Sequence, residues 1–271
     1  MKEIAIVYLM AGISSRFNGK IKQLARVGPN SETLLECSLS QSLPAGFSKI
    51  IFIVGPKTYD AIKEIFGDSY KGVPIQYAFQ DFDTTKRDRP WGTTDAVTTI
   101  KNLVTTSFVV CNGDDLYGEQ AFKLLFNHLQ NNENCATVGY KLKNVVPKHG
   151  SVNRGIFQVE NNFVKSVKEN FNVTLDNFRE KDLSEESLCN MNLFALTPEA
   201  LEMLDDIVIK FKEKNKEDRK IECLLPEDIG ELINEQKIKV KIYPTDETWI
   251  GITNPDDEEH VKELLKNFKF G

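Results

Sequence analysis

Short apolar runs alternate with segments of helical periodicity through the first half of this chain, and this alternation limits the folds that it can adopt. The runs expected to form strands span residues 4–9, 49–54, 74–79 and 107–111, and the segments expected to form helices span residues 32–43, 59–66, 93–103 and 119–131. Strands that alternate with helices are typical of βαβ units, in which the strands run parallel. We therefore expect an α/β protein with a mainly parallel sheet.

The second half of the chain has shorter apolar runs, which favour antiparallel pairing. These runs span residues 136–142, 155–159, 163–167 and 191–196. Residues 237–243 indicate a late strand, residues 211–219 a solvated helix end or loop, and residues 256–268 a closing helix that Pro255 would start well. We expect the short runs to extend the sheet or to cover its edge.

The composition limits the setting in which the chain works. Of its 271 residues, 41% are hydrophobic, which is enough for a real core, and no linker-like stretch divides them. The net charge of −6 argues against a nucleic-acid partner. The five cysteines are scattered without a C-x-x-C pair, so we expect no disulfide framework, no zinc site and a reducing, cytoplasmic setting. No window is long enough to span a membrane, and the start is unlike a signal peptide. The oligomeric state stays open, a homo-oligomer included.

The loop after the first strand has the composition of a phosphate-binding loop. It contains Gly12, Ser14 and Ser15, and the cations Arg16 and Lys22 follow. Small residues let backbone N–H groups face an anion, and the cations complete its neutralisation. The loop matches neither G-x-x-x-x-G-K-[ST] nor G-x-G-x-x-G, and an ordinary βα turn is the alternative. We expect it to hold a polyphosphate.

Two adjacent carboxylates follow the fourth expected strand. Asp114 and Asp115 come after the Asn112-Gly113 turn, and neighbouring carboxylates are costly to hold together without a cation. Oxygen ligands of this kind suit Mg²⁺, although Asp also suits a turn or a helix N-cap. Ligands of open parallel sheets bind beyond the carboxyl ends of the strands, so these carboxylates, the phosphate loop and residues 80–92 are expected to meet at one edge.

The segment 89–95 precedes an expected helix and carries several candidates. Thr93 is one of three residues able to cap that helix, and Gly92 would allow a flat base to approach the backbone. Trp91 is more readily interpreted as a buried anchor than as a stacking platform. The three histidines are isolated and lack the spacing of metal ligands or of a catalytic triad.

These motifs, taken in order, resemble a known family. Residues 9–24 (LMAGISSRFNGKIKQL) resemble the L-A-A-G-x-S-S-R-M-G-x-x-K-Q-L signature of nucleotidyltransferases, which include sugar-1-phosphate nucleotidylyltransferases and small-molecule cytidylyltransferases. The resemblance continues through residues 32–36 (ETLLE), 89–93 (RPWGT), 112–118 (NGDDLYG) and 249–253 (WIGIT). It implies a GT-A-like, Rossmann-like three-layer sandwich formed by residues 1–271 as one domain. The nucleotide-binding half would cover about residues 1–130 and the acceptor-binding, closing half about residues 131–271.

The resemblance also implies roles for individual residues. Arg16, Lys22 and Asp114 would be catalytic, and Asp114 with Asp115 would hold Mg²⁺. Lys22 would neutralise charge near the reacting phosphate. The nucleotide would contact Met10, Ala11, Gly12, Ser14, Ser15, Gln80, Gly92 and Thr93, with Gln80 and Gly92 at the base edge. The acceptor would contact Asp115, Arg154, Glu169 and Asn192.

The chain departs from the family pattern at several positions. Gly251 stands where relatives place a second metal-binding Asp. Asp115 or Asp246 is a candidate substitute, and a metal held by fewer protein ligands is the alternative. Asn170 replaces the lysine of an E-K pair, and Asp95 places an acid where relatives often have a neutral residue or His. These departures affect the acceptor side more than the nucleotide side.

The function that the resemblance implies is transfer of NMP from an NTP to a phosphorylated small molecule, with release of pyrophosphate. A sugar 1-phosphate is the leading acceptor. Alternatives are a cytidylyltransferase for a polyol phosphate, phosphonate or phospho-amino acceptor, a non-catalytic nucleotide-binding regulator, and a GT-A glycosyltransferase. The last would normally carry a spaced D-x-D motif, whereas these two aspartates are adjacent.

Overall fold

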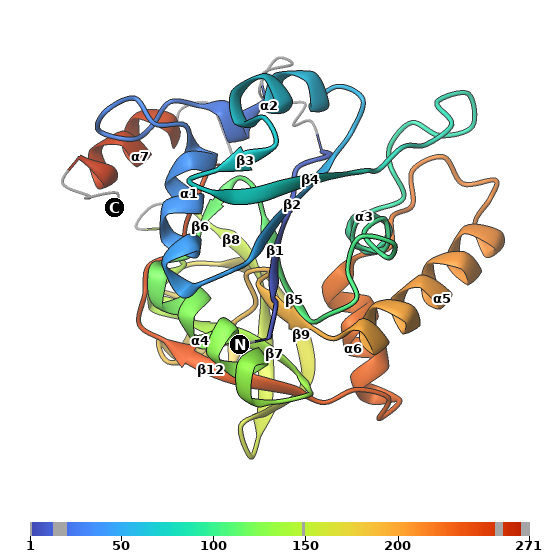
Figure 1. Cartoon of the computed structure of the whole chain (residues 1–271). Helices are drawn as coiled ribbons and strands as arrows, with labels where there is room; N and C mark the ends of the chain where they lie inside the picture. The colour runs from blue at the N-terminus through green and yellow to red at the C-terminus, as the bar shows by residue number, and fades with distance from the viewer. Residues whose placement is uncertain (1, 13–20, 148–149, 253–256, 267–271) are drawn as a thin grey trace.

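A central sheet runs through the molecule (Figure 1), and it has eleven strands. The computed structural model describes residues 2–12, 21–147, 150–252 and 257–266. The strand order in this sheet is β10-β8-β9-β12-β7-β11-β5-β1-β2-β4-β3. Its strands are β1 (Ala5–Leu9), β2 (Lys49–Val54), β3 (Ser69–Tyr70), β4 (Val73–Phe79), β5 (Phe108–Asn112), β7 (Cys135–Lys141), β8 (Val152–Glu160), β9 (Phe163–Val173), β10 (Leu188–Cys189), β11 (Phe194–Leu196) and β12 (Val240–Thr245).

The sheet is mixed, as expected, but it is mainly parallel only in its N-terminal part. Strands β4, β2, β1 and β5 lie parallel, as do β7 and β12. The other pairings of this sheet, among the described residues, are antiparallel. The reason is the length of the connections, since β8 and β9 are joined only by Asn161 and Asn162. Both asparagines have positive φ, at 52° and 63°, which is the backbone of a two-residue hairpin turn and leaves no room for a crossover helix.

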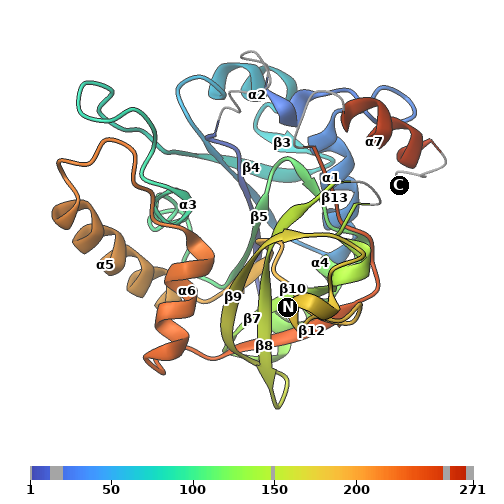
Figure 2. The same ribbon diagram turned by 180° about the vertical axis from the view of Figure 1, so that it is seen from behind.

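Helices cover both faces of the sheet, which makes three layers (Figures 1 and 2). One face carries α1 (Leu34–Ser42), α2 (Tyr59–Phe66), α4 (Glu119–Asn131) and α7 (Asp257–Leu265). The other carries α3 (Thr93–Thr98), α5 (Pro198–Lys214) and α6 (Leu225–Asn234). Of α5 only the solvated end was expected, within residues 211–219, and α6 was not predicted from the sequence. Short 3₁₀ turns lie at η2 (Lys22–Leu24), η3 (Leu43–Ala45), η4 (Leu142–Asn144) and η5 (Arg179–Lys181).

Local hydrogen bonds explain where two of the expected helices begin and end. The expected helix 32–43 begins at Leu34 because Thr33 and Glu36 form a capping box, in which the Thr33 side chain accepts from the Glu36 N–H and the Glu36 carboxylate accepts from the Thr33 N–H. The helix α3 ends at Thr98, earlier than expected. The hydroxyls of Thr98 and Thr99 donate to carbonyls three residues back, which competes with helix propagation.

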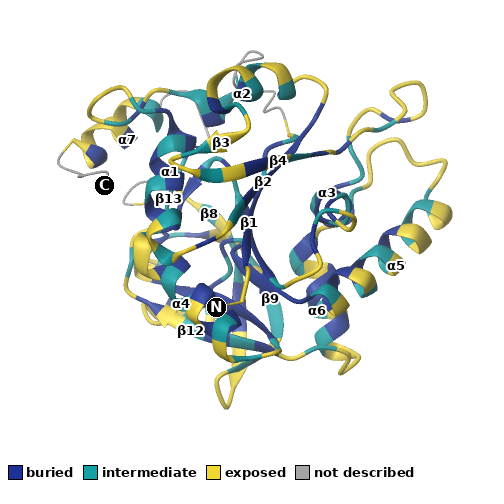
Figure 3. Cartoon of the chain, in the orientation of Figure 1, coloured by how far each residue is buried: buried dark blue, intermediate teal, exposed yellow. Residues whose placement is uncertain are grey.

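The core lies between the sheet and each helical layer (Figure 3). Residues of β1, β2 and β5 point alternately into the two layers. Ile6 and Tyr8 join the cluster under α1 and α4, and Val7 joins the cluster under α3, α5 and α6. This two-sided burial fixes the strand ends from which the candidate site is built. Within the part of the chain that the structure describes, no helix has the length and apolar character needed to cross a membrane.

Candidate functional site

The aspartate pair lies beyond the carboxyl end of β5, where the chain forms a small second sheet. There β6 (Asp115–Leu116) pairs antiparallel with β13 (Ile250–Gly251), so that Asp115 lies opposite Gly251. The last motif of the sequence therefore packs directly against the aspartates, although about 135 residues separate them along the chain.

Lys22 meets the first of these aspartates. Its Nζ lies 2.8 Å from Oδ2 of Asp114 and donates to the carbonyl of Ile252 at 3.0 Å. The side chains of Lys22 and Asp114 are 16% and 25% exposed, so the pair is largely shielded from solvent. The lysine thus joins the segment before α1, the turn after β5 and the end of β13 at one point of the strand edge.

The second aspartate is buried. The amide Nδ2 of Asn112 donates to Oδ2 of Asp115 at 2.8 Å, and the Tyr117 hydroxyl does so at 3.2 Å. Burial, followed by the negative charge of Asp114, raises the pKa of Asp115 to about 7. A divalent cation would relieve this repulsion. The two carboxylates fit Mg²⁺, which needs few protein ligands when phosphate and water complete its shell. Among the described residues, no group of three or more His, Cys, Asp or Glu side chains could hold a metal.

Gly251 occupies a crowded position. A Cβ atom there would lie 2.4 Å from Cζ2 of Trp249 and 2.7 Å from Oδ1 of Asp115. Asp115 therefore fills the space beside the position at which relatives carry their second aspartate. Asp246, the other candidate substitute, instead pairs with Lys141 at 2.6 Å and is exposed. Of the two candidates, the geometry favours Asp115.

Gln80 and Gly92 lie together at the carboxyl end of β4. The Gln80 Nε2 donates to the Gly92 carbonyl at 2.8 Å and to Oδ2 of Asp95 at 2.8 Å. Gly92 has φ +110°, and a Cβ there would lie 2.1 Å from the Cys223 carbonyl oxygen. The backbone therefore requires glycine at this position because of Cys223, whereas the sequence analysis attributed the glycine to the approach of a base.

Thr93 is the first residue of α3, so it does not cap this helix. Gly92 is the N-cap of α3 and provides no side chain. The Thr93 hydroxyl instead accepts from the N–H of Leu225, the first residue of α6, at 2.9 Å. Trp91, expected to be a buried anchor, is half-buried; the Arg87 guanidinium lies 3.4 Å over its ring and Phe211 packs edge-on against it. Helices α3, α5 and α6 are thereby held together beside the strand ends.

A cavity of about 700 Å³ opens beside Asp115. Its wall contains all four residues expected to contact an acceptor, together with one residue expected to contact the nucleotide. These five residues are Thr93, Asp115, Arg154, Glu169 and Asn192. The structure therefore brings together side chains that come from α3, β6, β8, β9 and the turn before β11.

Arg154 and Glu169 have different surroundings in this cavity. The Arg154 guanidinium donates to the carbonyls of Val145 and Asn153 and lies 5.2 Å from the centre of the Trp249 ring. Most of its donors therefore bind the protein itself. Burial raises the pKa of Glu169, and the nearby Arg154 charge opposes that shift. Glu169 is thus a carboxylate that is incompletely compensated and faces a polar cavity.

The acidic side of this cavity was not predicted from the sequence. Glu227, Glu231 and Glu235 line it from α6 and its C-cap. Their spacing of four residues places them on one helical face, and the apolar residues Leu225 and Ile229 lie on the buried face. Acidic residues four positions apart, with apolar residues on the opposite face, form the sequence pattern that could have predicted α6.

Several expected nucleotide contacts occur near the start of the chain. Ser14, Ser15 and Arg16 lie outside the described residues. Met10 is fully buried and its N–H donates to the Ile53 carbonyl at 2.8 Å, so its side chain and N–H serve the core and the sheet instead of facing a ligand. Ala11 is partly exposed and Gly12 is exposed beyond the end of β1.

Comparisons with known proteins identify a family and a relative. A family model described as nucleotidyl transferase matches residues 18–267. A D-glycero-alpha-D-manno-heptose 1-phosphate guanylyltransferase of Campylobacter jejuni is 25% identical over 263 residues, covering 96% of this chain and 99% of the relative.

Two solved structures have a similar fold. A protein of Bacillus anthracis assigned as a glucose-1-phosphate thymidylyltransferase, in complex with sucrose, aligns with a TM-score of 0.72 at 12% identity over 100% of this chain and 98% of that one. The inositol-1-phosphate CTP transferase of T. maritima aligns with a TM-score of 0.67 at 14% identity over 98% and 97% of the two chains.

Proposed function

The chain belongs to the nucleotidyl transferase family and is a nucleotidyltransferase, and we propose that it transfers NMP from an NTP to a sugar 1-phosphate, with release of pyrophosphate. The observation that carries this proposal is the continuity between the aspartate pair and the 700 Å³ cavity, since Asp115 lines that cavity and Asp114 meets Lys22. A nucleotide held over the aspartates and an acceptor held in the cavity would have their phosphates side by side. The guanylyltransferase relative supports a sugar 1-phosphate as the acceptor.

Charge neutralisation is the main contribution that we assign to the protein. The acceptor phosphate is already anionic, so its oxygen attacks the α-phosphorus without a strong base, the bond to the pyrophosphate oxygen breaks, and pyrophosphate leaves with the electron pair. Positioning and electrostatics dominate such reactions. Lys22 would lower the repulsion between the two anions. Asp114 and Asp115 would hold Mg²⁺, which supplies further positive charge to the phosphates when bound.

The remaining roles follow the same assignment. Gly12, Ser14, Ser15 and Arg16 would hold the triphosphate, and Ala11 would approach it. Gln80, Gly92 and Thr93 would lie on the base side, and Glu169, Arg154 and Asn192 on the acceptor side. We extend the proposal to a GT-A-like fold in which residues 1–271 act as one domain, and to a cytoplasmic enzyme, which the free, buried cysteines support.

A second candidate acceptor is favoured by one observation. Glu169, Glu227, Glu231 and Glu235 give the cavity an acidic wall, and carboxylates bind either sugar hydroxyls or an amine. A cytidylyltransferase acting on a polyol phosphate or a phospho-amino compound would use the same wall. A non-catalytic regulator is the third alternative, supported by glycine at position 251.

Pyrophosphate release separates these candidates. We would test four NTPs with Mg²⁺ against sugar 1-phosphates, inositol 1-phosphate and phosphoethanolamine. Turnover with a sugar 1-phosphate supports the proposal, turnover only with CTP and another acceptor supports the second candidate, and tight NTP binding without turnover supports a regulator. Asp114→Asn should abolish turnover. Asp246→Asn is the matched control, because Asp246 is exposed and pairs with Lys141, and this variant should leave activity unchanged.

A further inference from the structure

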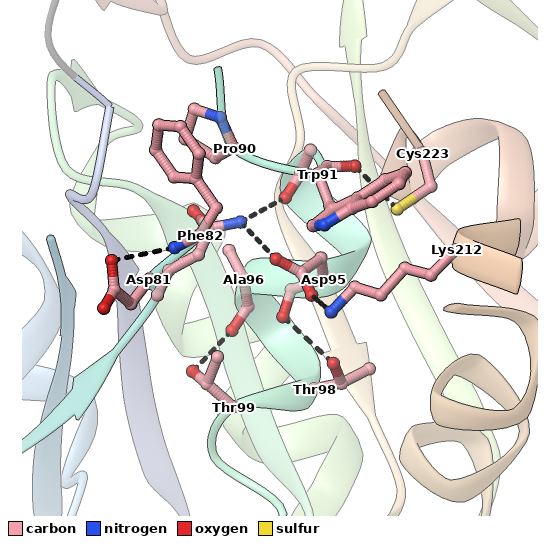
Figure 4. Close-up of polar contacts among 12 residues, drawn as sticks. Asp81, Phe82, Pro90, Trp91, Asp95, Ala96, Thr98, Thr99, Lys212 and Cys223 are labelled. Atoms are coloured by element: carbon pink, nitrogen blue, oxygen red, sulfur yellow. Dashed lines mark hydrogen bonds and ion pairs between the residues drawn. The ribbon is translucent and has the colours of Figure 1, made fainter. Parts of the chain in front are cut away.

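A buried polar cluster surrounds the glutamine on the base side of the proposed site. Gln80 follows β4 and is 5% exposed, and Asp95 of α3 is 4% exposed. Lys212, near the end of α5, forms an ion pair with Oδ1 of Asp95 (Figure 4). The other carboxylate oxygen, Oδ2, accepts from Gln80. The cluster thus contains one amide, one carboxylate and one ammonium group in series.

Both N–H groups of the Gln80 amide are used inside this cluster. One donates to the Gly92 carbonyl and the other to Asp95, each at 2.8 Å. Rotating the amide by half a turn would bring its Oε1 against a carbonyl oxygen and a carboxylate oxygen, and neither of these can donate. The surroundings therefore permit one orientation of the amide, and it directs Oε1 away from both partners.

We propose that Asp95 is a positioning residue that fixes Gln80 as a hydrogen-bond acceptor for the base of the NTP. This inference rests on the proposed function, because it takes residues 80–93 as the base side. A base that donates an N–H toward Gln80 is bound, and a base that presents only an acceptor there is disfavoured. Asp95 therefore determines base selectivity without touching the base, since it holds the amide that does.

Lys212 compensates the charge of Asp95 and does not itself orient Gln80. Asp95 is buried and would be costly as an isolated charge, so the ammonium group compensates it. The carboxylate accepts from Gln80 whether or not Lys212 is present. Base selectivity should therefore depend on the acceptor at position 95 and only indirectly on the cation.

An asparagine at position 95 separates these tasks. In Asp95→Asn the carboxamide has one oxygen, and Lys212 attracts it. The Nδ2 group then faces the Gln80 N–H. Because both groups are donors, the hydrogen bond is lost and the Gln80 amide is no longer held in one orientation. In the double variant with Lys212→Met, the carboxamide oxygen at position 95 no longer has a cation to face and can accept from Gln80 again. The double variant should therefore recover the base preference that Asp95→Asn loses.

The experiment measures binding of four NTPs by equilibrium dialysis, together with KM and kcat wherever turnover occurs. Asp95→Asn should weaken binding of the preferred NTP by about tenfold and reduce its preference over the other bases, as expected for one hydrogen bond, with kcat little changed. Lys212→Met alone should keep the preference, and the double variant should regain it. Asp205→Asn, which removes the exposed ion pair of Asp205 with Lys101 nearby, is the matched control and should change nothing.

A measurement on the wild-type protein removes any dependence on how the variants fold. An analogue of the preferred NTP, methylated at the N–H of its base edge, should bind at least about tenfold more weakly. Three results would overturn the inference but not the proposed function. They are an unaltered base preference in a folded Asp95→Asn variant, a double variant that does not regain the preference, and equal binding of the methylated analogue. A wild-type protein that binds no NTP would overturn the inference and the proposed function together.

Discussion

Because Gly251 is crowded, we expect a side chain at this position to destabilise the fold by an amount that can be measured. Gly251→Ala would place a Cβ 2.4 Å from Cζ2 and 2.5 Å from Cη2 of the Trp249 indole, and 2.7 Å from Oδ1 of Asp115. The indole is rigid, so its ring must move as a whole, and Asp115 is tied to Asn112 and Tyr117. Overpacking of this kind lowers the free energy of unfolding by about 1–3 kcal/mol. The corresponding fall in Tm is roughly 2–10 °C.

Gly230 provides the matched control for this substitution. It lies in the middle of α6, and a Cβ there would have no neighbour within 4 Å. Gly230→Ala should therefore raise the free energy of unfolding by about 0.5–1 kcal/mol, because alanine loses less backbone entropy in a helix than glycine does. The same chemical change should thus have opposite signs at the two glycines.

Urea unfolding followed by circular dichroism, with Tm as a second readout, measures both effects. A double-mutant cycle with Trp249→Leu should show that Gly251→Ala costs at least about 1 kcal/mol less once the indole is removed. A Gly251→Ala variant as stable as the wild type, or a cycle without coupling, would show that Trp249 does not restrict the side chain at position 251. Unchanged stability would also mean that an aspartate could be placed at position 251 without displacing Trp249.

Three further perturbations test other parts of the structure. Lys22→Met should lower kcat in the pyrophosphate assay by about 100-fold or more, because the charge that faces Asp114 is lost from the reaction; a wild-type kcat would contradict the role proposed for it. Thr33→Ala removes the capping box with Glu36 and should cost about 1 kcal/mol in urea unfolding without changing activity; unaltered stability would count against the cap. Burial raises the pKa of Glu247, whose carboxylate accepts from the first N–H groups of α4. The folded chain therefore keeps a proton that the unfolded chain has released, so the contribution of Glu247 to stability falls as pH rises above the ordinary glutamate pKa. Glu247→Gln should flatten that part of a stability profile measured in urea, and an identical profile in wild type and variant would disprove this.

The sequence predicted the N-terminal part of the fold best. The strands β1, β2, β4 and β5 were predicted within a residue or two, and α2 and α4 with the bounds that the structure has. Each of these elements carries an apolar run or a regular apolar stripe that is buried in the fold, so local pattern and tertiary burial agree.

The elements that were missed depend on distant contacts. The two-residue strands β6 and β13 exist because residues 115 and 251 meet, which no local pattern encodes. The helices α5 and α6 pack on α3, and α6 also packs on β9 and lines the cavity. Sequence reasoning expected the aspartates to lie near the loop after β1, and Lys22 does meet Asp114. It could not choose between Asp115 and Asp246, because only side-chain contacts distinguish them.

The position of β12 has a consequence for how the chain is made. This late strand inserts between β7 and β9, which precede it by about 70 residues or more. While a ribosome synthesises the intervening segment, the facing edges of β7 and β9 have no partner, and unpaired edges promote association with other nascent chains. The middle of the sheet can close only after residues 240–245 have emerged, so we expect native structure to be gained late in synthesis and chaperones to act on the chain until then.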